Sequence, residues 1–129
     1  MQSAKCRMQN EANGSSLSEG LLDFGAEIVA LITILNKRAV GRHISGQLLR
    51  SATSAGANYE EACSAESPAD FVHKLQIVLK ELRESLYWLR LIQKTNLVGD
   101  TNTDLPKLLQ EAKELTHIIA KSIVTAKKG

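Results

Sequence analysis

The chain has 129 residues, a net charge of +2 and a composition that is 43% hydrophobic but only 4% aromatic. This length suits one domain with a single hydrophobic core, and the small net charge does not by itself indicate a nucleic-acid-binding protein. Because aromatic residues are scarce, Leu, Ile, Val and Ala must build the core. This composition favours an all-α fold.

The hydrophobic residues recur at helical spacing in four segments, which follow a polar start. We expect Ser18 to cap the first helix, Gly41 to mark the turn after it, and Ser67 to cap the third helix ahead of Pro68. Asp104 is the expected cap of the fourth helix. The predicted domains are a disordered lead-in (1–16), a four-helix bundle (17–126, with helices at about 18–38, 42–63, 68–95 and 105–126) and a basic tail (127–129).

The second predicted helix has two unlike faces. Small residues line its packing face, and Gly56 in a helix interior costs about 1 kcal/mol relative to Ala. Gly56 therefore indicates either a close helix crossing or the approach of a partner subunit or ligand. The other face is polar, and it is either simply solvated or a subunit interface. The candidate interface residues, with one addition from the third helix, are Gln47, Arg50, Ser51, Ser54, Asn58, Glu61 and Glu84.

Short connections favour sequential antiparallel neighbours, hence an antiparallel up-down-up-down four-helix bundle. This topology gathers basic residues at one end: Lys37, Arg38, Arg42, His43, Arg90, Lys94 and Lys107. Helix-dipole matching explains some of these cations, but not Arg42 and Lys107 at helix starts. The candidate nucleic-acid-binding residues are Lys37, Arg38, Arg42 and Lys94. We expect no stacking on bases, because no exposed aromatics are interleaved with these cations.

The sequence predicts no catalytic residue, cofactor, metal site or small-molecule substrate. His43, His73 and His117 fall on three different helices, and no phosphate-binding loop or nucleophile motif is present. The two cysteines, Cys6 and Cys63, form no CxxC motif. With no signal peptide or membrane-spanning run, we expect a cytoplasmic protein with reduced thiols and a buried Cys63.

Three stretches carry a family resemblance: QLLRSATSAGANYEEA, ESPADFVHKLQIVLKELRESLYWLRL and EAKELTHIIAKSIVTAKK. They resemble the four-helix-bundle family of 23S ribosomal RNA intervening-sequence proteins, over about Leu21 to Lys128. The matching positions are Gln47, Arg50, Ser51, Ala52, Ser54, Asn58, Glu61, Ala62, Phe71, Leu75 and Glu84. The chain departs from the commonest family version, which has an Asn-Ile-Ala-Glu-Gly ending, at Tyr59 to Ala62.

The resemblance implies an antiparallel bundle without enzymatic activity that is often assembled into a homopentamer. A related group, the accessory variability proteins of diversity-generating retroelements, works with a reverse transcriptase and RNA. We therefore expect a self-assembling bundle that binds structured RNA or a reverse-transcriptase-type nucleoprotein through its basic end. The alternative is a structural or protein-binding scaffold with no nucleic-acid role.

Overall fold

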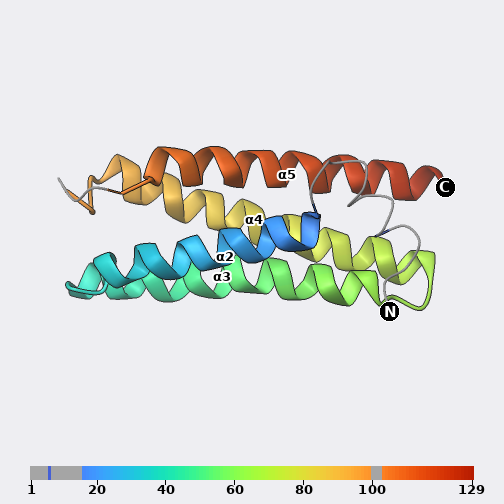
Figure 1. The fold of residues 1–129 in the computed structure, drawn as a ribbon, viewed down its shortest axis with the longest axis horizontal. Coiled ribbons are helices and arrows are strands. Elements are labelled where there is room, and N and C mark those ends of the chain that lie inside the picture. The colour runs from blue at the N-terminus through green and yellow to red at the C-terminus, as the bar shows by residue number, and fades with distance from the viewer. Residues whose placement is uncertain (1–5, 7–15, 100–102) are drawn as a thin grey trace.

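The computed structural model describes residues 6, 16–99 and 103–129, and it folds them into a bundle of four helices. These are α2 (Leu17–Leu35), α3 (Ala39–Cys63), α4 (Pro68–Lys94) and α5 (Leu105–Lys128). Each helix runs antiparallel to the next along the chain (Figure 1). The prediction of an all-α bundle is confirmed, and the described residues contain no strand. The predicted lead-in lies outside the described residues except for Cys6 and Ser16.

The helix boundaries follow from local capping chemistry, with two departures from prediction. Ser16, and not Ser18, caps α2, because its hydroxyl accepts a hydrogen bond from the Glu19 amide at 3.3 Å. The cap of α4 is as predicted: Ser67 accepts from the Asp70 amide at 3.1 Å, and Pro68 occupies the first turn. Asp104 stands at the N-cap position of α5, but its side chain makes no capping bond.

The connection between α2 and α3 lies before Gly41, not at it. α2 ends at Leu35, so Lys37 and Arg38 belong to the connection, and α3 already begins at Ala39. Gly41 is a buried residue in the first turn of α3, where a Cβ would lie 1.8 Å from the Leu35 carbonyl oxygen. Glycine is required there because it lets the start of one helix approach the end of the other.

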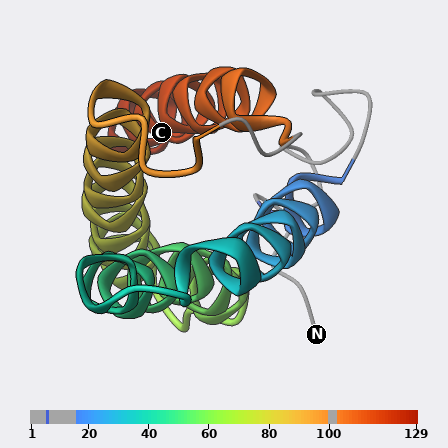
Figure 2. The same cartoon turned by 90° about the vertical axis from the view of Figure 1, so that its left-hand side faces the viewer.

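Leu, Ile and Ala side chains from all four helices build the core, with Phe24, Tyr59 and Phe71 as its buried aromatic rings. Helices that are consecutive in the chain pack along their lengths, whereas the first and last helices, α2 and α5, contact each other far less. The end-on view in Figure 2 shows the four helices in ring order, with this wider separation between α2 and α5. Two grooves lie between α2 and α5.

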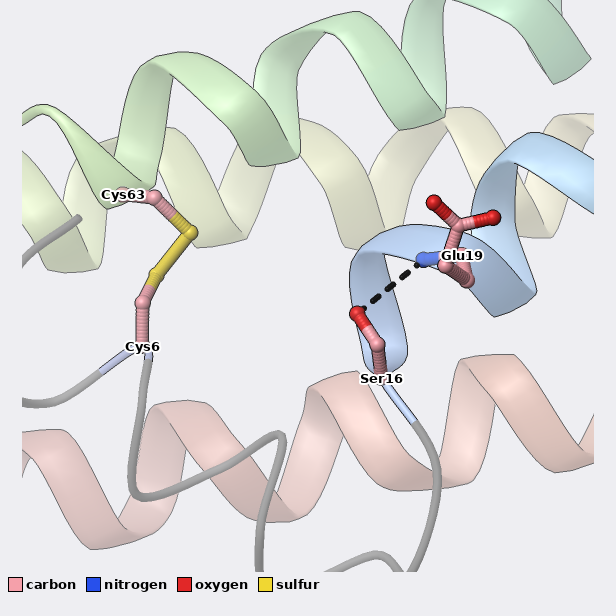
Figure 3. Close-up of a disulfide and its surroundings, with 4 residues drawn as sticks. All are labelled: Cys6, Ser16, Glu19 and Cys63. Carbon is pink, nitrogen blue, oxygen red and sulfur yellow. Dashed lines mark hydrogen bonds between the residues drawn. A yellow bond between two sulfur atoms is a disulfide. The ribbon is translucent and has the colours of Figure 1, made fainter. Parts of the chain in front are cut away.

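A disulfide joins Cys6 to Cys63 at the end of α3, across 57 positions of sequence (Figure 3). Cys63 is buried as predicted, with 2% of its surface exposed. The prediction of reduced thiols is wrong for this structure. Sequence spacing gave no sign of the pairing, because only the fold brings the two cysteines within a Cα–Cα distance of 5.4 Å. A cytoplasmic location consequently loses the argument from reduced thiols.

The carboxyl end of the chain is helical almost to its last residue. α5 continues through Lys128, so the two lysines predicted as a tail form its last turn, where cations complement the helix dipole. None of the helices in the described part of the chain combines the length and apolarity needed to span a membrane.

Candidate nucleic-acid interface

The connections α2–α3 and α4–α5 lie at one end of the bundle, which we call the basic end (Figure 1). Lys37 lies in the first connection, Arg38 at the N-cap of α3, Arg42 in its first turn, and Lys94 in the last turn of α4. All four predicted cations therefore come from the end that faces the viewer in Figure 2, and all four are exposed.

The four predicted cations of the basic end have no ion-pair partner within the described chain. None of Lys37, Arg38, Arg42 and Lys94 lies within 4.0 Å of a described carboxylate. The first turn of α3 contains no acidic residue, so Arg38 and Arg42 lie beside the positive end of its macrodipole without compensation. The start of α5 differs, because Lys107 lies 4.0 Å from the Glu111 carboxylate and Asp104 occupies the N-cap position. The arrangement leaves this end open to an external anion.

The sequence analysis missed one exposed aromatic residue that lies among basic residues of α4. Tyr87 on α4 is 59% exposed, and Arg83 and Arg90 flank it one turn away on either side. The prediction that no exposed aromatic is interleaved with basic residues is therefore wrong. The signal was present in the sequence, in the helical spacing of Arg83, Tyr87 and Arg90 on α4.

Part of the predicted subunit interface packs inside the subunit. Ser51 on α3 is fully buried, and its hydroxyl lies 2.8 Å from that of Ser85 on α4. Arg50 donates to Glu81 at 2.9 Å and also forms a hydrogen-bonded ion pair with Glu84. Arg50, Ser51 and Glu84 thus join α3 to α4, which explains small and charged residues on this face without a second subunit.

Hydrogen bonds set the ionisation of Glu84. Its partial burial alone would raise the pKa of the carboxyl group, but hydrogen bonds from Trp88 and Arg50 outweigh this and hold the pKa below its usual value. The Trp88 indole N–H donates to the Glu84 carboxylate at 3.2 Å. Glu84 is therefore an ionised acceptor that fixes the positions of both Arg50 and Trp88.

The other candidate interface residues are more accessible. Glu61 is exposed and lies 3.6 Å from Lys74, while Gln47 is half-buried. Asn58 is also half-buried and donates to the Ser54 carbonyl oxygen one turn earlier, at 2.9 Å. Part of the surface of Gln47, Ser54, Asn58 and Glu61 thus remains accessible to a second subunit. The subunit interface stays a prediction at these four positions.

An apolar groove of about 570 Å³ runs between α2 and α3. Small residues Gly25, Ala26 and Gly56 form part of its lining, and Leu22 and Val29 stand on its rim with 64% and 46% of their surfaces exposed. A Cβ at Gly56 would lie 3.8 Å from Leu21, which is ordinary contact. The helix crossing therefore does not require glycine there, and Gly56 instead widens the groove.

The grooves between α2 and α5 are acidic. The larger one, of about 290 Å³, is lined by Asp23, Glu27, Glu111 and Glu114 among others. Burial raises the pKa of Glu111, and the neighbouring Glu27 raises it further. Among the residues that the structure describes, no three His, Cys, Asp or Glu side chains are grouped so that they could hold a metal ion.

The chain is similar to a known protein family and to a solved structure. The family model described as "23S rRNA-intervening sequence protein" matches residues 21–121. A solved structure is also similar: a protein of unknown function from the S23 ribosomal protein family of Bacteroides thetaiotaomicron VPI-5482. It is 36% identical, with a TM-score of 0.71, and the match covers 83% of this chain and 97% of that one. No curated protein matches.

Proposed function

Because the chain belongs to the 23S rRNA-intervening sequence protein family, we propose that it is a non-enzymatic, self-assembling bundle that presents its basic end to structured RNA or a nucleoprotein partner. The observation that carries the proposal is the set of exposed cations at that end, Lys37, Arg38, Arg42 and Lys94. None of these has a carboxylate within 4.0 Å among the described residues.

Arg38 and Arg42 lie at the start of α3, where the helix dipole is unfavourable to cations. A cation at a helix start is disfavoured by roughly 0.3–1 kcal/mol, and a nearby carboxylate would normally offset this. Arg38 and Arg42 have no such partner in the first turn of α3. A bound phosphate would neutralise both side chains and would also interact favourably with the amide groups of the helix start. The polyanionic backbone of RNA would therefore supply the negative charge that the basic end lacks.

The proposed mechanism is electrostatic positioning of the RNA backbone, which needs no catalytic side chain. A single subunit offers few phosphate contacts, and its net charge is only +2. A homo-oligomer, for which the family resemblance suggests a pentamer, would present several basic ends at once and would increase the apparent affinity by avidity. Self-assembly and RNA binding are thus linked in this proposal.

Charge reversal at two positions tests the proposal. Arg38→Glu/Arg42→Glu should weaken the binding of a structured RNA by at least about 10-fold at ~50 mM salt, because two phosphate contacts become repulsive. The matched control is Lys127→Glu/Lys128→Glu, which changes the net charge equally but at the opposite end of the bundle, where α5 finishes. The control should lose much less affinity. Equal losses in both variants would contradict binding at the basic end.

The alternative is a protein-binding or structural scaffold with no nucleic-acid role, and the α2–α3 groove is the feature that favours it. Exposed Leu22 and Val29 beside small residues form an apolar surface suited to contact with another helix. Light scattering on Leu22→Glu/Val29→Glu would then show a lower mass than wild type. Asn58→Leu makes the corresponding test of the polar face, since Arg50→Glu would also break bonds within the subunit.

A further inference from the structure

One face of α4 carries four cations arranged around an exposed aromatic ring: Lys80, Arg83, Tyr87, Arg90 and Lys94. The alternating spacing of three and four residues places them in one line, which we call the α4 stripe. At 1.5 Å per residue the stripe is about 21 Å long. All five residues are exposed, and Lys94 also belongs to the basic end. The stripe therefore continues the basic end along the side of the bundle.

The cations of the stripe are available to an external partner. No described carboxylate lies within 4.0 Å of the ammonium or guanidinium groups of Lys80, Arg83, Arg90 or Lys94. Glu84, which lies on the same helix, already accepts hydrogen bonds from Arg50 and Trp88. The α4 stripe is consequently a positive surface whose cations form no direct ion pair within the described chain.

Tyr87 is supported by two further rings. Its ring centroid lies 5.1 Å from that of Trp88 in an edge-to-face contact, and Trp88 makes a second edge contact with His43 of α3 at 6.3 Å. The Trp88 indole cannot turn freely, because its N–H donates to Glu84. Tyr87 thus rests against a fixed neighbour while 59% of its surface stays open. This is a preorganised aromatic surface among cations.

We propose that Tyr87, supported by Trp88, stacks on an unpaired base of a bound RNA, while the cations of the α4 stripe hold the flanking phosphates. The inference rests on the RNA-binding function proposed above and names the part of the RNA that is recognised. Alternating cations and an exposed aromatic ring form the combination that binds single-stranded nucleic acid without sequence preference. Fully paired RNA buries its base faces and offers Tyr87 nothing to stack on.

A protein partner fits the stripe less well. An apolar contact over Tyr87 would remove water from Arg83 and Arg90 on either side, and burying cations without a counter-charge is costly. RNA avoids this cost, since its phosphates neutralise the cations while a base covers the ring. The juxtaposition of ring and cations therefore favours a nucleic acid with unpaired positions.

The test compares two RNAs of equal nucleotide number, a hairpin with an unpaired loop and a fully paired duplex, by fluorescence anisotropy at ~50 mM salt. Tyr87→Ala should weaken hairpin binding by about 10-fold and leave duplex binding unchanged, since base–aromatic stacking contributes in this range. Tyr87→Phe keeps the ring and should bind both RNAs like wild type. Val124→Ala, at a 54% exposed site on α5, is the matched control.

A second readout uses Trp88, the single tryptophan of the chain. A base stacked on Tyr87 would lie close to the indole, so the hairpin should quench tryptophan emission more than the duplex does, and Tyr87→Ala should abolish this difference. Unchanged hairpin affinity in Tyr87→Ala, or equal losses on both RNAs, would overturn the stacking proposal while RNA binding at the basic end stands. If wild type binds neither RNA, the proposed function fails and this inference fails with it.

Discussion

The guanidinium group of Arg50 on α3 lies 2.9 Å from the carboxylate of Glu81 on α4, whose side chain is only 10% exposed. Removing Arg50 would leave this carboxylate poorly solvated and without its partner. Because Arg50 itself is 49% exposed, we expect Arg50→Ala to lower the free energy of unfolding by only about 2 kcal/mol, measured by urea denaturation. The control is Lys74→Ala, which removes the more exposed ion pair with Glu61 and should cost less than about 0.5 kcal/mol. Equal costs would contradict this account.

Glu111, in the larger groove between α2 and α5, should make the stability of the fold depend on pH in a definite direction. Since burial and Glu27 raise the pKa of Glu111, the folded state binds a proton at Glu111 more tightly than the unfolded state does. The ionised carboxylate therefore destabilises the fold above the raised pKa. This penalty disappears as the pH falls below the ordinary value of 4.5.

Glu111→Gln should accordingly raise the Tm at pH 7, and the gain over wild type should shrink to nothing near pH 4. Thermal unfolding followed by circular dichroism at several pH values measures this difference. Glu114→Gln, on an exposed neighbour in the same groove, is the control and should give a smaller gain. A lower Tm for Glu111→Gln at pH 7 would show that the sign is wrong.

Two glycines of α3 should respond oppositely to alanine. At Gly41 a Cβ would collide with the Leu35 carbonyl oxygen, and backbone cannot move aside cheaply, so Gly41→Ala should destabilise by about 1–3 kcal/mol. At Gly46 a Cβ would meet nothing within 4 Å, so Gly46→Ala should stabilise by up to about 1 kcal/mol. Denaturation midpoints of the two variants decide the matter, and a stabilising Gly41→Ala would refute the close approach.

The disulfide should contribute measurably to stability. Closing a loop across 57 positions restricts the unfolded chain, and we expect its loss to cost about 2–4 kcal/mol. Dithiothreitol should therefore lower the denaturation midpoint of wild type but not that of Cys6→Ser. Thiol titration of denatured, unreduced protein supplies the contrary case: finding both cysteines free would show that the bond does not form.

Capping residues and apolar spacing predicted the fold well, because each of these patterns involves residues only one or a few helical turns apart. Ser67 and Pro68 identify the start of α4 by themselves, and apolar spacing defines each core-facing stripe. Gly41 misled because glycine is usual at turns, whereas here a tertiary approach requires it. Capping by Ser16 was missed because Ser18 offers the same chemistry two residues later.

The tertiary contacts around the site were harder to predict, because their partners are distant in sequence. Arg50 and Glu81 are 31 positions apart, and Cys6 and Cys63 are 57 apart, so neither pairing leaves a local pattern. The α4 stripe was different. Its helical spacing can be read from the sequence. The sequence analysis assigned the cations only to the ends of the bundle, and so it did not recognise the face of α4 on which Tyr87 lies between Arg83 and Arg90.

The salt dependence of RNA binding tests the central claim most directly. Phosphate contacts release counterions, so with about four contacts per subunit the affinity should fall by about 100-fold between ~50 and ~200 mM salt. Arg38→Glu/Arg42→Glu should flatten this dependence, because fewer phosphates are then contacted. Fluorescence anisotropy of wild type on a structured RNA gives the answer. A steep fall supports the basic end as an RNA interface, and no binding at ~50 mM salt would contradict it.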